Sequence, residues 1–142
     1  MSITHADNYG LVITLPKTLT KDELARIREL ISAKAALIAK ALNANQLDIT
    51  TSSEGLSFPW WDHLPECEHI TAYAQFLTRL VAYAKRIGRT THRATSDEVV
   101  NEKYELRSLL YRIGLKGREH AQVRKILLKP LSGNSAWKNP KK

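Results

Sequence analysis

The sequence predicts an α+β fold: a small three-stranded sheet in β-α-β-β order, followed by a helical C-terminal half of about three helices. Three observations predict it. Residues 10–15 are a β-branched run, residues 20–43 repeat apolar side chains at helical spacing, and this spacing returns through most of 66–128. The 142 residues suit one domain over 1–138, with 139–142 as a disordered basic tail.

The first strand and helix have clear boundaries in the sequence. Pro16 closes the run at 10–15, which is typical of the end of a strand. Thr20 and Glu23 have the spacing of a capping box, in which the side chain of each residue hydrogen-bonds the backbone N–H of the other. The apolar stripe that follows predicts a helix from this box to about Asn43.

Residues 46–50 and 56–58 are short apolar runs on either side of a polar connector that ends in a glycine. This pattern predicts a β-hairpin with Leu47 and Ile49 on the same face as Leu56 and Phe58. Because a lone two-stranded hairpin is marginal in water, we expect it to pair with the first strand.

The second half reads as helices with glycine boundaries. Periodicity predicts helices over 66–87, 99–113 and 118–128. An exposed basic loop over 89–96 separates the first two, and Ser96 is a candidate N-cap for the second. A turn-rich segment ending in Trp137 follows the last helix.

The net charge of +8 is concentrated in one part of the chain. Residues 1–48 carry six basic and five acidic side chains, and residues 49–70 carry four acidic side chains and no Lys or Arg. Residues 71–142 carry sixteen basic against five acidic side chains. This asymmetry indicates a polyanionic partner, DNA or RNA, for the C-terminal half.

The two helices around Gly114 and Gly117 resemble a helix-turn-helix. The alternative is a plain helical hairpin with solvated charges, and the apolar run 126–128 favours burial of that part of the last helix. In the nucleic-acid interpretation the cations of this pair neutralise phosphates. The candidate residues are Arg107, Arg112, Lys116, Arg118, Arg124 and Lys125.

Trp60 and Trp61 lie in a proline-bracketed connector over 59–65. Adjacent tryptophans in a connector more often close one end of the core, which is the favoured interpretation, and less often form a partner-binding patch. The surrounding acidic stretch is a poor place to meet a phosphate backbone. The pair is therefore the candidate site of the alternative function, a protein-interaction module or small homo-oligomer that binds no nucleic acid.

No motif in the chain is typical of an enzyme or a cofactor site. His63, Cys67 and His69 supply three ligands where structural zinc takes four, and their spacing matches no standard module. No glycine-rich loop accompanies Cys67, and the six glycines fall singly at the ends of elements. We expect no catalysis, no cofactor and no metal.

The remaining features predict a cytoplasmic protein without a membrane partner. The single cysteine, Cys67, allows no intramolecular disulfide, as in a reducing compartment. The first ten residues lack the pattern of a signal peptide, and no apolar run has the length of a membrane span.

The stretch Val100-Asn-Glu-Lys-Tyr-Glu-Leu-Arg107, with Leu110-Tyr-Arg-Ile-Gly114 and Leu131-Ser-Gly-Asn-Ser-Ala-Trp137, resembles a family of small "virulence-related" proteins. These belong to mobile elements and phages of Gram-positive bacteria. The segments 10–16 and 57–60 are also similar to the family's pattern, so the resemblance covers most of the chain. The resemblance implies that the protein belongs to a mobile element, and it assigns no role to any single residue. We therefore expect an accessory protein of a bacterial mobile element that binds nucleic acid through its basic helical half.

Overall fold

The computed structural model describes residues 2–5, 10–16, 18–86 and 101–131, with the backbone alone for 2–5. These ranges contain a sheet and five α-helices, which confirms the predicted α+β fold. The strands are β1 (Ser2–His5), β2 (Leu11–Leu15), β3 (Thr50–Ser52) and β4 (Gly55–Trp61). The helices are α1 (Lys21–Ala33), α2 (Ala35–Leu42), α3 (Cys67–Arg86), α4 (Glu102–Arg112) and α5 (Ala121–Leu128), with a 3-10 turn (Arg118–His120) before α5.

The sheet is antiparallel throughout, in the order β1-β2-β4-β3. β2 lies where the sequence predicts it, and its buried residues alternate with half-buried ones. Ile13 of β2 is paired with Phe58 of β4. β1 is an additional edge strand that the sequence analysis did not predict, because its four residues carry no distinctive pattern and pair with β2 through the backbone.

The hairpin differs from its predicted boundaries. β3 begins only at Thr50, so the predicted strand over 46–50 is wrong except at its last residue, and β3 itself is fully exposed. The turn is short, because Ser52 pairs directly with Gly55. β4 continues through Pro59 to Trp61, and a register shift there sets two residues of β4 against one of β2. A bulge of this kind accommodates a proline that cannot donate to the ladder.

The predicted helix over 20–43 is present as two helices. The capping box is confirmed: the Glu23 N–H donates to Thr20 Oγ1 (3.1 Å), and the Thr20 N–H donates to Glu23 Oε1 (2.9 Å). The helical run is interrupted at Lys34 (φ −127°, ψ 28°) and ends at Asn43 in the left-handed region (φ 50°). Lysine does not break helices by itself, because its intrinsic helix propensity is favourable. The ion pair of Lys34 with Glu105 of α4 (3.6 Å) shows that tertiary contacts accompany the break.

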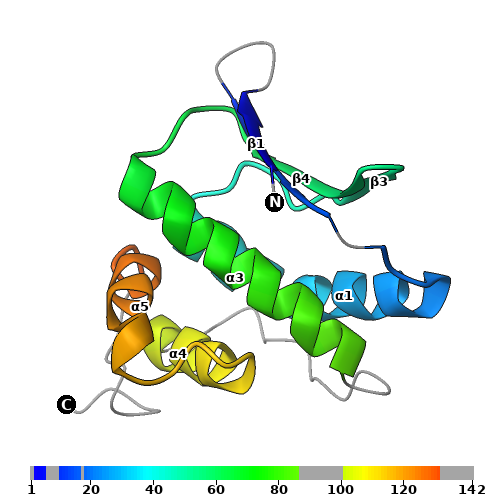
Figure 1. The fold of residues 1–142 in the computed structure, drawn as a ribbon. Helices are drawn as coiled ribbons and strands as arrows, with labels where there is room; N and C mark the ends of the chain where they lie inside the picture. The colour runs from blue at the N-terminus through cyan, green and yellow to red at the C-terminus, as the bar shows by residue number, and fades with distance from the viewer. Residues whose placement is uncertain (1, 6–9, 17, 87–100, 132–142) are drawn as a thin grey trace.

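Helix α3 crosses the middle of the view, with the sheet above it and α4 and α5 below it (Figure 1). It contacts α1 and α5. It spans almost the full predicted range, 66–87, of which residue 87 lies outside the described residues. Within the described residues, no helix is both long and apolar enough to cross a bilayer.

Helices α4 and α5 lie within the predicted ranges 99–113 and 118–128, but each is shorter than its predicted range. Asn101 is the N-cap of α4, where its Oδ1 accepts from the Tyr104 N–H (3.2 Å). The predicted cap at Ser96, the basic loop and the segment ending in Trp137 lie outside the described residues.

Candidate nucleic-acid interface

The candidate interface is the α4–α5 hairpin, which comprises residues 102–128. Gly114 (φ 96°) and Gly117 (φ 88°) adopt backbone conformations that favour glycine and turn the chain between the helices. Ile113 and Leu115 are buried beside them, so the turn is anchored to the core. This anchoring gives the side chains of the turn and of α5 defined positions.

Helix α5 separates its apolar and polar residues cleanly. Val123 and Leu127 are buried, with Ile126 and Leu128 half-buried beside them, which accounts for the long apolar residues of this helix. The opposite face of α5 exposes Gln122 and Lys125, with Lys129 at the C-cap, and Arg118 is exposed in the 3-10 turn that precedes the helix. We term these four residues the cationic stripe. A buried apolar face therefore leaves a continuous polar face for a ligand.

The acidic side chains of α4 form ion pairs with lysines outside the hairpin. Glu102 pairs with Lys40 of α2 (2.8 Å), and Glu105 pairs with Lys34 (3.6 Å). Residues 101–131 contain eight basic and three acidic side chains, and these pairs occupy two of the three acids. Glu119, exposed next to Arg118, is the third. The hairpin surface is consequently dominated by positive charge.

Two arginines converge on Tyr111, in the last turn of α4. The guanidinium carbon of Arg107 lies 4.4 Å from the ring centroid of Tyr111, and that of Arg124 lies 5.5 Å from it. Arg107 Nη2 also donates to the Tyr111 hydroxyl (2.9 Å). Arg124 Nη1 donates to the Gly117 carbonyl (2.8 Å), so Arg124 also holds the turn.

Helix α3 adds a further cation at the other side of the turn. Arg79 Nη2 lies 3.5 Å from His120 Nε2, and a Cβ placed on Gly114 would lie 3.5 Å from Arg79 Nη1. His120 Nδ1 is buried and has no hydrogen-bond partner in the described structure. The sequence analysis missed Arg79, because nothing in the local sequence shows which helix packs against α3.

The six predicted phosphate-binding residues fall into two groups. Arg118, Lys125, Lys116 and Arg112 are exposed on the stripe, in the turn or at the end of α4. Arg107 and Arg124 are half-buried and gather on Tyr111. Lys129 belongs to the cationic stripe and was not predicted, although its position four residues after Lys125 could have indicated it.

Trp60 and Trp61 are core residues. Their exposed fractions are 0% and 3%, and both belong to β4 instead of the predicted connector. Trp60 Nε1 donates to the Asp48 carbonyl (2.7 Å), and Trp61 Nε1 donates to the Leu42 carbonyl (2.8 Å). This burial confirms the favoured interpretation of the pair as core residues. The alternative of a partner-binding patch at Trp60 and Trp61 is wrong, because their side chains are almost completely buried.

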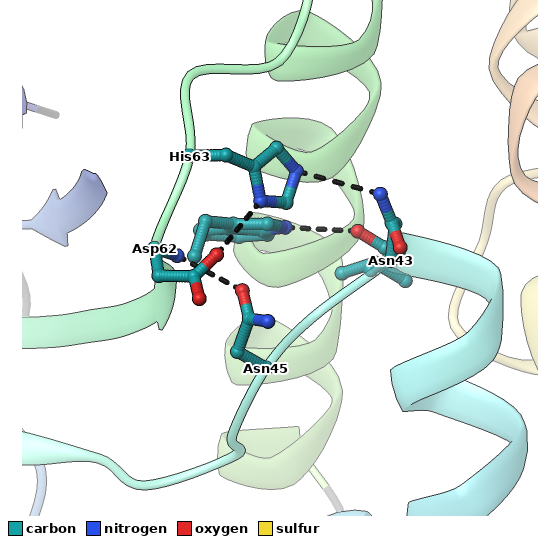
Figure 2. A network of polar contacts seen from close by, with 6 residues as sticks. Asn43, Asn45, Asp62 and His63 are labelled. Atoms are coloured by element: carbon teal, nitrogen blue, oxygen red, sulfur yellow. Dashed lines mark hydrogen bonds and ion pairs between the residues drawn. The ribbon is translucent and has the colours of Figure 1, made fainter. Parts of the chain in front are cut away.

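A polar network lies at the end of the sheet beyond these tryptophans (Figure 2). His63 Nδ1 lies 3.3 Å from Asp62 Oδ1, and His63 Nε2 lies 3.4 Å from Asn43 Nδ2. The Asp62 N–H donates to Asn45 Oδ1 (2.9 Å). These contacts join the segments before β3 and after β4. Among the described residues, no three His, Cys, Asp or Glu side chains form a group that could hold a metal ion.

Comparisons with protein-family models, with curated proteins and with solved structures each give no match for this chain.

Proposed function

We propose that this chain is an accessory protein of a bacterial mobile element and binds nucleic acid through the α4–α5 hairpin. The observation that carries the binding proposal is the cationic stripe on the exposed face of α5. The mobile-element setting depends on the sequence resemblance alone.

The geometry of the stripe suits a phosphate backbone. Gln122 and Lys129 are seven residues apart, which is roughly 10 Å at the rise of an α-helix, and Arg118 precedes them in the 3-10 turn. Successive phosphates of one strand advance about 3.4 Å along a duplex axis, so a strand can follow the stripe past several phosphates. The pairing of Glu102 and Glu105 with lysines elsewhere limits local repulsion of those phosphates.

The test is a pair of triple variants with equal loss of charge. Arg118→Gln/Lys125→Gln/Lys129→Gln removes the cations of the stripe. Lys21→Gln/Lys85→Gln/Arg86→Gln removes one Arg and two Lys that are exposed on α1 and at the C-terminal end of α3. Affinities for a single strand and a duplex of about 20 nucleotides are measured by fluorescence anisotropy across a salt series.

We expect the stripe variant to lose affinity and to reduce the slope of log K against log salt by about two to three. The control variant should retain most of the affinity and most of the salt dependence. If neither strand form binds at low salt, the proposal is wrong. Equal losses in the two variants would show that net charge attracts the polyanion without a defined site.

A protein-interaction function gains no specific support from the described surface. The large hydrophobic side chains exposed there are Leu64 (52%), in the segment between β4 and α3, and Tyr111 (37%), on α4. An interface that excludes water needs a contiguous apolar patch, which these two side chains do not supply.

A further inference from the structure

Tyr111 is an exposed aromatic side chain inside a cationic cluster. Its exposed fraction is 37%, and it projects from the last turn of α4. The other exposed large hydrophobic residue in the described part of the chain, Leu64, lies in the segment between β4 and α3. Two cations, Arg107 and Arg124, lie against this ring, so an aromatic group and two guanidinium groups form one cluster at the surface.

The two arginines beside Tyr111 are held in place by the protein itself. Arg107 is fixed by its hydrogen bond to the Tyr111 hydroxyl (2.9 Å) and by its position over the ring. Arg124 is fixed by the carbonyls of Leu115 (3.3 Å) and Gly117 (2.8 Å). A ligand that meets these guanidinium groups need not order them, because most of that entropy is lost on folding.

We propose that Arg107, Tyr111 and Arg124 form a stacking site for one base of a single-stranded nucleic acid. This inference rests on the proposed function and narrows its ligand from nucleic acids in general to single strands. A base presents its π-face to a protein only when it is unpaired and unstacked, whereas a duplex covers that face. An aromatic ring flanked by guanidinium groups is suited to such a face, and the same cations attract the adjoining phosphates.

The cluster and the cationic stripe lie on neighbouring faces of α5. Arg124 and Lys125 are consecutive residues of this helix, so their side chains point about 100° apart. A strand bound along the stripe reaches Tyr111 by turning from the face of Lys125 toward the face of Arg124. The stripe alone does not discriminate between strand forms, because phosphates are common to both.

The experiment separates stacking from charge. An oligo-dT strand of about 20 nucleotides is compared with an abasic strand of the same length and with a duplex of that length. The proteins are the wild type, Tyr111→Phe and Tyr111→Ala. Circular dichroism and the free energy of unfolding establish that each variant is folded.

We expect the wild type to prefer oligo-dT over the duplex, and Tyr111→Ala to weaken oligo-dT binding by at least about fivefold. Tyr111→Phe should lose much less oligo-dT affinity than Tyr111→Ala, because the ring remains and only the hydrogen bond from Arg107 to the hydroxyl is lost. Binding of the abasic strand should be the same for Tyr111→Ala and Tyr111→Phe.

Preferential duplex binding, or equal oligo-dT affinities for Tyr111→Ala and Tyr111→Phe, would overturn the stacking site. In that case the proposed function still stands if the stripe variant loses affinity and its matched control does not. Absence of binding to every strand overturns both proposals together.

Discussion

Trp61 and Tyr73 stack face to face, with ring centroids 5.2 Å apart and ring planes 8° from parallel. The contact joins β4 to α3, and the Trp61 indole also donates to the Leu42 carbonyl at the end of α2. Trp61 thus links three elements that are distant in sequence. Its neighbour Trp60 meets Phe58 edge to face at 5.4 Å, so the aromatic side chains of β4 form part of the core.

Trp61→Ala should lower the free energy of unfolding by about 3–5 kcal/mol, because it removes a buried aromatic side chain and leaves a cavity. Chemical denaturation measures the change. Trp61→Phe should cost less, since it keeps a ring against Tyr73 and loses only the hydrogen bond and part of the volume. A cost below about 1 kcal/mol for Trp61→Ala would contradict the packing described for this residue.

The stability of the protein should fall as pH rises above about 10, in part because of Tyr73. Burial raises the pKa of the Tyr73 phenol. The unfolded chain therefore releases this proton at a lower pH than the native state does, and deprotonation favours unfolding. Tyr73→Phe should flatten the pH dependence in denaturant titrations from pH 8 to 11. An equally steep loss in this variant would show that Tyr73 is not the group responsible.

At acid pH the capping box should weaken. The backbone N–H of Thr20 donates to Glu23 and lowers the pKa of this carboxyl group. The stability from the carboxylate is thus present above the unfolded pKa near 4.3 and is lost as pH falls through the native value. The stability difference between wild type and Glu23→Gln should shrink between pH 6 and pH 3.

Glu29→Gln is the matched control, because it removes a carboxylate from the same helix without touching the cap. If the two variants show the same pH dependence relative to the wild type, the capping contact is not its source. Thr20→Ala should independently cost about 0.5–2 kcal/mol at neutral pH.

Gly117→Ala should destabilise the protein by about 1–3 kcal/mol. Gly117 has φ 88° and ψ 173°, a region that side chains avoid. A Cβ there would also lie 3.1 Å from Glu119 Oε2. The double variant Gly117→Ala/Glu119→Ala removes that contact and keeps the backbone conformation. It should remain destabilised in thermal unfolding, and full recovery would show that the cost came from the side chain.

Glu119→Gln should strengthen nucleic-acid binding by about two- to fivefold at low salt, because it removes a carboxylate beside Arg118. The gain should fade at high ionic strength. Glu54→Gln makes the same change of charge in the exposed turn between β3 and β4 and should have a smaller effect. Equal gains in both variants would argue against a binding surface at the hairpin.

Elements whose causes are local could be predicted from the sequence. The capping box at Thr20 and Glu23 and the long helix α3 depend on contacts between residues close in sequence. The strand over 11–15 pairs with distant residues, but its β-branched residues and the proline after it could be recognised in the local sequence. The charge asymmetry is a property of composition. It identified the basic half, but it could not show which of its cations share a face.

Features that need a distant partner could not be predicted. β1 exists through its pairing with β2, and the break at Lys34 accompanies an ion pair with Glu105, seventy-one residues away. Burial of Trp60 and Trp61 was the favoured prediction, but their place in β4 was not predicted, because it depends on pairing with β2. The sequence by itself determined the helical periods, the caps and the excess of positive charge. Only the tertiary structure placed Arg107 and Arg124 on Tyr111, because helical spacing orients a side chain on its own helix and does not specify which other helix it will meet.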